Sequence, residues 1–459
     1  VGLEAGANSR VRAIATFAGE GGVVMRIAII GTGISGSLVA RLLSTQHDVT
    51  VFEANNYLGG HANTVDVSVG GRTFSVDTGF MVFNDRTYPN FCRLLDLLEI
   101  RSQPSDMSFS VSCGKSGLEY QGSSLDGLFA QRSNCVRPSF LRMLWDIARF
   151  NKFGMQAAAS GELKDGRSVG EFVSECGVGS RFVDQYLVPM ASAIWSSSPQ
   201  AILDFPADFM IGFFANHGLM QLRDRPQWRT IVGGSRNYVE ALLEPIRENI
   251  RLQTPIACVA RTEHDVSVVP VNGPRERFDE VVFASHADQV LGMLADSTRS
   301  ERQILRAFPY QPNEAVLHTD TRQLPSRRRA WASWNYHVSA GENRSAAVTY
   351  DLSRLQNHDS QVPILLTLNP SDEIDPTKIL RTFSYHHPAY SRESISAQRR
   401  FKEISGRNRT HYCGAYWGYG FHEDGVNSAL AVAEHFGIDL DACIVASTKE
   451  PSRIAVASR

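Results

Sequence analysis

The stretch that decides the fold is MRIAIIGTGISGSLVARLLSTQHDVTVFEA, residues 25–54. It reads as a buried strand, a glycine turn, an amphipathic helix and a second strand. Gly31, Gly33 and Gly36 have the G-x-G-x-x-G spacing, which gives a tight turn, a close approach to a pyrophosphate and close helix–strand packing. Glu53 closes the second strand, where a carboxylate can accept hydrogen bonds from both ribose hydroxyls. The stretch therefore predicts a dinucleotide site in a Rossmann-like domain.

The length and charge of the chain limit the number of domains and the class of binding partner that can be expected. A chain of 459 residues exceeds one ordinary core, so we expect two domains. The 46 Lys and Arg residues nearly cancel the 48 Asp and Glu residues. This balance gives no electrostatic footprint for a nucleic acid and no steering of a strongly charged substrate. We expect a small-molecule partner held by local contacts, and no nucleic acid.

The seven cysteines are odd in number and form no C-x-x-C pair, so neither a disulfide framework nor a zinc site is indicated, and we expect no metal. No apolar run approaches the roughly 18 residues that span a bilayer. We expect a cytoplasmic protein whose contact with the inner membrane, if it makes one, is peripheral. The oligomeric state is left open.

A second glycine pair helps to distinguish FAD from NAD. Gly59 and Gly60 follow Glu53 in the string NNYLGGHANT and provide another bare backbone approach, as expected for a ligand that continues past its pyrophosphate toward an isoalloxazine. Such pairs also occur in plain turns. No second G-x-G-x-x-G is present, so a separate NADPH domain is not indicated.

The run GTGISG, then Glu53, then LGG, then VDTGF at 76–80, resembles the N-terminal half of the FAD site in the flavin-containing amine oxidase, protoporphyrinogen oxidase and phytoene desaturase superfamily. The resemblance extends from Met25 to about Gly437. The strings DTGFMVFNDRTYPNF, LVPMASAIWS, NHGL, RPQWRTIVGGSRNY and CGAYWGYGFHEDG resemble a bacterial branch of predicted FAD-dependent oxidoreductases, often encoded beside cyclopropane-fatty-acid synthase.

The resemblance implies FAD as cofactor and a set of positions that bind it. These are Gly31, Gly33, Ile34, Ser35, Gly36, Glu53, Ala54, Gly59, Gly60, His61, Thr78, Gly79, Phe80, Ile256, Gly414, Gly425 and Val426. Two positions depart from the pattern of the superfamily. His61 stands where an arginine usually follows the glycine pair, and Ala415 stands where an acidic residue usually follows the glycine of the C-terminal motif.

The C-terminal motif, CGAYWGYGFHEDGVNSALAVAEHF at 413–436, changes from an aromatic, glycine-rich turn to an apolar helical rhythm. We expect the helix to start near Gly425 and to aim its N–H groups at the pyrimidine edge of the flavin, where the dipole stabilises negative charge. In the alternative, Asp424 is only a helix N-cap and the aromatic residues are only core.

The predicted fold class is α/β, in an α+β two-domain arrangement. A Rossmann-like FAD-binding domain is interleaved with a substrate domain of helices and a mixed sheet. The expected ranges are a disordered extension at 1–24, an FAD-binding domain at 25–105, 225–290 and 400–437, a substrate domain at 106–224 and 291–399, and a tail at 438–459. Within 251–286 we expect three short strands joined by turns at 263–265 and 272–274. The part of this segment at 280–284 is expected to return to the Rossmann sheet.

The expected substrate pocket is aromatic. Its candidate walls are Phe83, Trp195, Trp228, Trp334, Tyr416, Trp417 and Phe421. Such a pocket suits an acyl chain or isoprenoid better than a polyamine, whose ammonium groups need carboxylates or an aromatic cage.

The candidate general bases are His422, Glu423 and His217, although each histidine alone is also compatible with a structural role. We expect an FAD-dependent oxidase or desaturase that removes hydride from a lipid-like substrate such as a fatty-acyl chain. The alternatives are a flavin amine oxidase and a non-catalytic flavin-binding or electron-shuttling protein.

Overall fold

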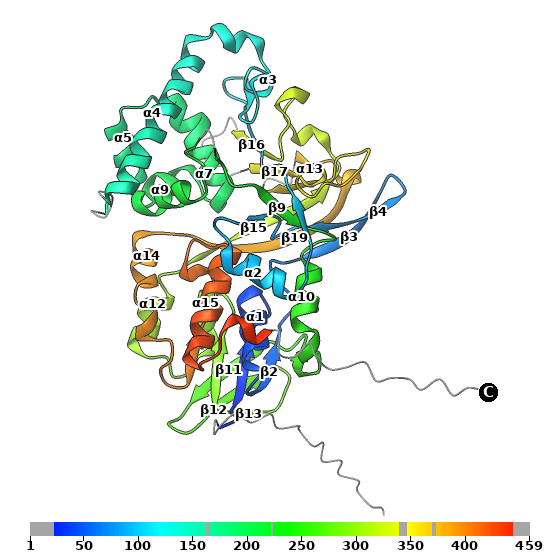
Figure 1. The fold of residues 1–459 in the computed structure, drawn as a ribbon, viewed down its shortest axis with the longest axis vertical. Helices are drawn as coiled ribbons and strands as arrows, with labels where there is room; N and C mark the ends of the chain where they lie inside the picture. The colour runs from blue at the N-terminus through cyan, green and yellow to red at the C-terminus, as the bar shows by residue number, and fades with distance from the viewer. Residues whose placement is uncertain are drawn as a thin grey trace, which may run out of the picture.

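The computed structural model describes residues 23–443, except positions 162, 164–165, 222–223, 339–346 and 370–372. Most of the predicted extension and most of the predicted tail lie outside this part of the chain. The Rossmann-like half and the substrate half stack along the long axis of the molecule (Figure 1). The mixed α and β composition agrees with the predicted fold class.

The Rossmann sheet has five parallel strands in the order β10-β2-β1-β14-β20. The strands are β1 (Arg26–Ile30), β2 (Asp48–Phe52), β10 (Ile250–Arg251), β14 (Glu280–Phe283) and β20 (Thr410–Tyr412). Three distant parts of the chain therefore build one sheet (Figure 1). In such a sheet, ligands bind outside the carboxyl ends of the strands.

The central strand β1 divides its side chains between two cores. Ile27 and Ile29 belong to the core shared with the helices α1 (Ile34–Leu43), α10 (Arg236–Leu243) and α15 (His422–His435). Ala28 and Ile30 belong to the core shared with the antiparallel sheet β11 (Ile256–Arg261), β12 (Val266–Pro270) and β13 (Glu276–Phe278). Alternate burial on both faces explains why β1 is apolar throughout its length after Arg26.

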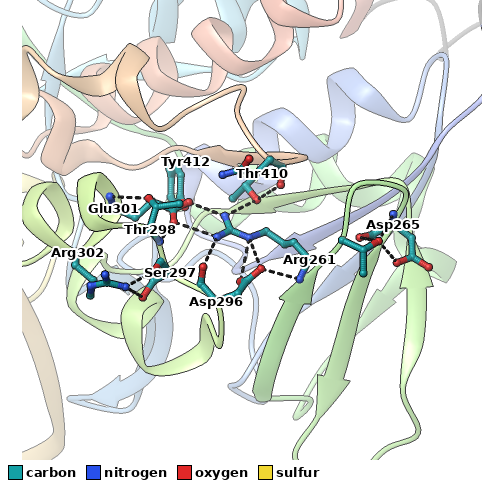
Figure 2. Close-up of polar contacts among 11 residues, drawn as sticks. Arg261, Asp265, Asp296, Ser297, Thr298, Glu301, Arg302, Thr410 and Tyr412 are labelled. Atoms are coloured by element: carbon teal, nitrogen blue, oxygen red, sulfur yellow. Dashed lines mark hydrogen bonds and ion pairs between the residues drawn. The ribbon is translucent and has the colours of Figure 1, made fainter.

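A buried ion pair holds the three-stranded sheet to the Rossmann sheet (Figure 2). Arg261, at the end of β11, is paired with Glu301 of α12 (Arg299–Leu305) at 2.5 Å, and the two side chains are only 3% and 2% exposed. Asp296 also accepts from Arg261, and the hydroxyl of Tyr412 on β20 donates to Glu301 at 2.7 Å. The buried charges are therefore paired and hydrogen-bonded.

The substrate half contains a seven-stranded mixed sheet in the order β19-β15-β18-β17-β16-β7-β8. Its strands are β7 (Phe109–Cys113), β8 (Leu118–Gln121), β15 (Tyr310–His318), β16 (Trp334–Val338), β17 (Ala347–Asp351), β18 (Leu365–Leu368) and β19 (Ile379–Pro388). The pair β16–β7 is parallel and the other pairs are antiparallel. A helical layer covers one side, formed by α4 (Pro138–Ser160), α5 (Val169–Cys176), α7 (Val188–Trp195), α8 (Pro199–Asp204) and α9 (Ala207–Asn216).

The expected start of the last long helix is wrong by three residues. Helix α15 begins at His422, with Phe421 as N-cap, so Gly425 lies inside its first turn. The carboxylate of Asp424 accepts a hydrogen bond from the Phe421 N–H at 2.9 Å. Asp424 thus stabilises the helix start from the third helical position, and it is not the N-cap of the alternative prediction either.

Candidate functional site

A cavity of about 760 Å³ lies between the carboxyl ends of the Rossmann strands and the mixed sheet. The first glycine loop, Gly31 to Ser35, forms part of one end of it. Strand residues such as Trp334, Leu366 and Tyr385 contribute to the substrate end. One continuous space therefore joins the predicted dinucleotide site to the predicted substrate pocket.

The glycine loop is shaped by close approaches that exclude other residues. Gly31 has φ of +105°, and a Cβ there would lie 2.9 Å from the Ala284 carbonyl oxygen. A Cβ on Gly36 would lie 2.0 Å from the Gly31 carbonyl oxygen, so α1 can pack this closely only with glycine at that position. Gly33 has open space around it and no side chain caps its helix. The free N–H groups of α1 can thus meet a phosphate.

The Glu53 carboxylate lies in the cavity wall, held by four hydrogen bonds. It accepts from the N–H and hydroxyl of Thr32, at 2.9 and 2.6 Å, and from the N–H and side-chain amide of Asn55, at 2.8 and 2.9 Å. The two backbone bonds fix its position. The two side-chain donors can rotate away, which leaves room for two ribose hydroxyls.

The second glycine pair faces the first loop. Gly59 and Gly60 have φ of +101° and +58°, and a Cβ on Gly60 would lie 3.2 Å from Cα of Gly33. The next residue, His61, accepts a hydrogen bond from the Phe80 N–H at 2.7 Å through its carbonyl oxygen. The pair is therefore part of the cavity wall, unlike a plain surface turn.

Most of the predicted cofactor positions line this cavity. They are Gly31, Gly33, Ile34, Ser35, Glu53, Ala54, Gly59, Gly60, His61, Thr78, Gly79, Phe80, Ile256 and Gly414. Three others do not reach it: Gly36, Gly425 and Val426 are buried where helices pack. A Cβ on Gly425 would lie 2.6 Å from Ile34 Cγ2, so this glycine serves helix packing.

The aromatic wall is present in part. Trp195, Trp228, Trp334, Tyr416 and Phe421 line the cavity. Phe83 is buried behind it, in edge contact with Phe91. Trp417 lies outside the cavity, against Phe308 and Phe401. Several other apolar residues line the cavity and were not predicted from the sequence, namely Met190, Ile194, Tyr350, Leu366 and Leu368.

The cavity carries almost no charge. Among the described residues that line it, Glu53 is the only acid, and there is no Lys or Arg. Its polar groups are mainly hydroxyls, amides and imidazoles. The described part of the chain contains no cluster of His, Cys, Asp or Glu arranged to hold a metal ion.

Two of the three candidate bases line the cavity. His422 is stacked on Phe80, with 3.4 Å between ring centroids, and its Nε2 lies 2.8 Å from the Tyr238 hydroxyl. His217 donates from Nδ1 to the Phe213 carbonyl at 3.0 Å, which leaves Nε2 as an acceptor. Burial holds the pKa of His422 well below its ordinary value and lowers that of His217 to about 4. Both imidazoles are neutral at pH 7.

Glu423 lies outside this cavity. Its carboxylate accepts from the N–H groups of Asn90, at 3.0 Å, and Phe91, at 2.9 Å, in the first turn of α2 (Pro89–Leu97). It therefore satisfies free donors at a helix N-terminus. Its side chain lines a second pocket, which shares His217 and Phe421 with the cavity.

A cluster of four histidines lines the cavity and was not predicted as a unit. The ring centroid of His61 lies 5.5 Å from that of His387 and 6.0 Å from that of His286, which lies 6.3 Å from His386. Burial, with repulsion between the rings, lowers the pKa of His61 and His286 to about 4 and that of His387 to about 3. His61 lies more than 200 positions before the other three histidines, and His286 lies 100 positions before His386, so only the string HHP at 386–388 could have drawn attention to them.

The family profile described as flavin containing amine oxidoreductase matches residues 34–383. The chain belongs to this family. FAD is therefore its cofactor, and it is an FAD-dependent oxidoreductase. The glycine loops, the Glu53 carboxylate and the free N-terminus of α1 fit such a cofactor at one end of the cavity.

Solved structures show the same fold. Cyclohexylamine oxidase from Brevibacterium oxydans IH-35A has a TM-score of 0.64 and 16% identity, with coverage of 90% of this chain and 100% of that chain. The fatty acid isomerase from P. acnes that produces CLA has a TM-score of 0.63 and 14% identity, with coverage of 90% and 98%. At this identity, the likeness concerns the fold alone.

A curated relative shares a shorter segment. The 4,4'-diapophytoene desaturase (4,4'-diaponeurosporene-forming) of Staphylococcus aureus (strain MRSA252) is 39% identical over 62 residues. This segment is 13% of the present chain and 12% of the desaturase. The match thus spans about an eighth of the length of that relative.

Proposed function

We propose that this flavin oxidoreductase of the amine oxidase family removes hydride from an apolar, lipid-like substrate, and that a fatty-acyl chain is the best candidate. The observation that carries the proposal is the uncharged cavity. Apart from Glu53 at the nucleotide end, none of its described lining residues is an Asp, Glu, Lys or Arg. The substrate end is walled by Met190, Ile194, Trp334, Leu366 and Leu368.

The physical reason is the cost of desolvating a charge. An ammonium ion in a closed apolar space is costly unless carboxylates or a cage of aromatic faces compensate it. An acyl chain loses no hydrogen bonds on entering the same space and gains about 25 cal/mol for each Å² of apolar surface that leaves water.

A flavin amine oxidase remains the second candidate, because aromatic rings are present. The rings of Trp195 and Phe213 lie 4.9 Å apart, and Phe213 lies 5.0 Å from Phe421. Faces of this kind can attract a cation. The third reading is a protein that binds flavin or shuttles electrons without an organic substrate of its own.

Bound FAD supplies the hydride acceptor, and the protein supplies orientation and a dry environment. The aromatic and aliphatic wall excludes water from the reacting C–H bond. The neutral imidazole of His217 has an acceptor nitrogen free to take the proton that accompanies hydride removal, since its other nitrogen is bonded to Phe213.

Anaerobic titration of the yellow holoenzyme tests the proposal. We expect an uncharged ester of a long-chain fatty acid to bleach the flavin absorbance, and putrescine or cyclohexylamine to leave it unchanged. Bleaching by an amine alone would support the second candidate. No bleaching by either class, with the flavin still reducible by dithionite, would support the non-catalytic reading.

A pair of variants connects the result to the cavity. Trp334→Leu changes the cavity wall, whereas Trp331→Leu changes a tryptophan that lies outside it and is bonded to the Pro325 carbonyl. The first should raise the lipid concentration needed for half-maximal bleaching by about tenfold, as expected for the loss of a large buried contact. The second should leave it unchanged.

A further inference from the structure

The solvent face of helix α4 is unusually apolar for a surface. Leu141, Trp145 and Phe153 are 42%, 64% and 43% exposed. They are spaced by four and eight residues, so they lie in one stripe along the helix. Val136, two residues before the helix, is 80% exposed. Exposed large apolar residues that share one helix face, here with Arg149 over the Phe153 ring, indicate a surface that meets a partner.

Along α4, the same face carries positive charge and no exposed carboxylate of this helix. Arg142, Arg149 and Lys152 are exposed beside the apolar stripe. Asp146 is the only acid in α4, and it points into the protein, where it accepts hydrogen bonds from Arg142 at 2.9 Å and from the Gly179 N–H at 3.1 Å. The chain as a whole has a net charge of −2, so this basic face is a local feature.

The position of α4 leaves this face open. The opposite face of the helix, with Phe140, Met143 and Phe150, is buried in the core of the helical layer. The helix lies at the outer side of the substrate half, far from the Rossmann sheet (Figure 1). In the described part of the chain, no helix is long and apolar enough to cross a bilayer.

We propose that α4 binds the surface of an anionic lipid bilayer, with Trp145 and Phe153 among the head groups and Arg149 and Lys152 near the phosphates. A helix with aromatic and aliphatic residues bordered by cations is typical of interfacial binding. A second copy of this chain fits the face less well. Pairing α4 with itself about a twofold axis would bring the positive side chains of the two copies together, and they would repel each other. The inference is independent of which substrate the cavity takes.

Co-sedimentation of the yellow holoenzyme with vesicles tests the inference. We expect binding to vesicles of phosphatidylcholine and phosphatidylglycerol, and little binding to phosphatidylcholine alone. Added sodium chloride should weaken binding, because salt screens the attraction between the basic side chains of α4 and the anionic head groups. Absence of binding to the anionic vesicles at low salt would overturn the inference.

Matched variants locate the contact. Trp145→Ser with Phe153→Ser should reduce the bound fraction strongly. Removing one cation, by Lys152→Ala, should weaken binding about fivefold, the value expected for one charge near such a surface. The controls are Val271→Ser and Arg275→Ala, two exposed positions in the turn between β12 and β13.

Two readouts separate the outcomes. Flavin absorbance after purification reports that each variant is folded and loaded. Sedimentation velocity without lipid reports its oligomeric state. If the α4 variants bind vesicles as well as the wild-type protein and the controls do, the inference is wrong. If they instead convert a dimer to a monomer, the face joins two copies and the lipid proposal is also overturned.

Discussion

The hydroxyl of Ser35 donates a hydrogen bond of 2.9 Å to the carbonyl of Gly425, a residue 390 positions further along the chain. The bond joins the first turn of α1 to the first turn of α15. These helices begin at Ile34 and His422, and both of these residues line the cavity. The small residues at this contact therefore hold two helix N-termini at the same site.

The first prediction concerns Gly425. Gly425→Ala should destabilise the protein by about 1 to 3 kcal/mol, because its Cβ would lie 2.6 Å from Ile34 Cγ2 in a packed core. Gly425→Glu should lower flavin content as well, since it forces the two helices apart. Denaturant unfolding and flavin absorbance measure these effects. Gly292→Ala is the control, because a Cβ there meets no atom within 4 Å. Unchanged stability of Gly425→Ala would show that α1 and α15 are not packed this closely.

The second prediction concerns Glu53. Glu53→Gln puts an amide group among the donors of Thr32 and Asn55, and it removes the charge that strengthens bonds to ribose hydroxyls. We expect FAD to bind more weakly by about 1.5 to 3 kcal/mol per lost bond. Dialysis followed by flavin fluorescence measures the loss. Asp48→Asn, at the exposed start of β2, the strand that Glu53 follows, should retain FAD. Equal FAD retention by both variants would contradict the role of Glu53.

The shape of the glycine loop could be predicted from the sequence because its constraints are local. Gly31 needs a positive φ, Gly36 needs the absence of a Cβ, and both needs are met within one strand–turn–helix unit. The substrate end is different. Leu366 and Leu368 look like any residues of a buried strand, and only the pairing of β18 with β15 and β17 brings them to the cavity.

The error at the last helix has a similar cause. Glycine after Asp424 resembles a helix start in the sequence, yet the bond between the Asp424 carboxylate and the Phe421 N–H stabilises a start three residues earlier. For Glu423, the sequence suggests a chemical role, whereas the structure shows a contact with another helix. A carboxylate beside the motif resembles a catalytic group, whereas its bonds to Asn90 and Phe91 depend on the placement of α2, which no local pattern records.

The third prediction concerns the buried pair of Arg261 and Glu301. Glu301→Ala should destabilise the protein by about 3 to 5 kcal/mol, because it leaves the Arg261 guanidinium without its buried partner. Arg261→Met combined with Glu301→Leu should cost less than Glu301→Ala alone, since no charge then remains buried. Urea unfolding of the three proteins measures the difference. A double variant less stable than the single one would contradict the argument.

The same ion pair makes the stability of the folded protein depend on pH in acid. Bonds from Arg261, the Thr298 N–H and Tyr412 outweigh burial and lower the pKa of Glu301 to about 2, against an ordinary value of 4.5. A lowered carboxylate pKa contributes stability that is present above pH 4.5 and is lost as the pH falls toward 2. The acid unfolding of Glu301→Gln should therefore depend less on pH in this window.

The last prediction concerns the histidine cluster. The pKa of His61 and that of His286 are about 4 in the folded protein, against 6.5 for an ordinary imidazole, because burial and neighbouring rings disfavour the charged form. A depressed imidazole pKa means that the unfolded chain binds more protons. The contribution is fully present above pH 6.5 and is lost as the pH falls toward 4. We expect a loss of about 1 to 2 kcal/mol per imidazole across this window, after allowance for solvent screening.

Urea unfolding of FAD-free protein between pH 7 and pH 4 measures this loss. His61→Gln should flatten the pH dependence of the free energy of unfolding. His264→Gln, which changes an exposed histidine in the turn between β11 and β12, should not.

FAD-loaded protein provides a further comparison. If His61 faces the pyrophosphate, where the superfamily usually carries arginine, the bound phosphates favour its charged form. The loaded protein should then lose less stability toward pH 4 than the FAD-free protein. An identical slope in the two forms would place the cofactor's charge away from His61.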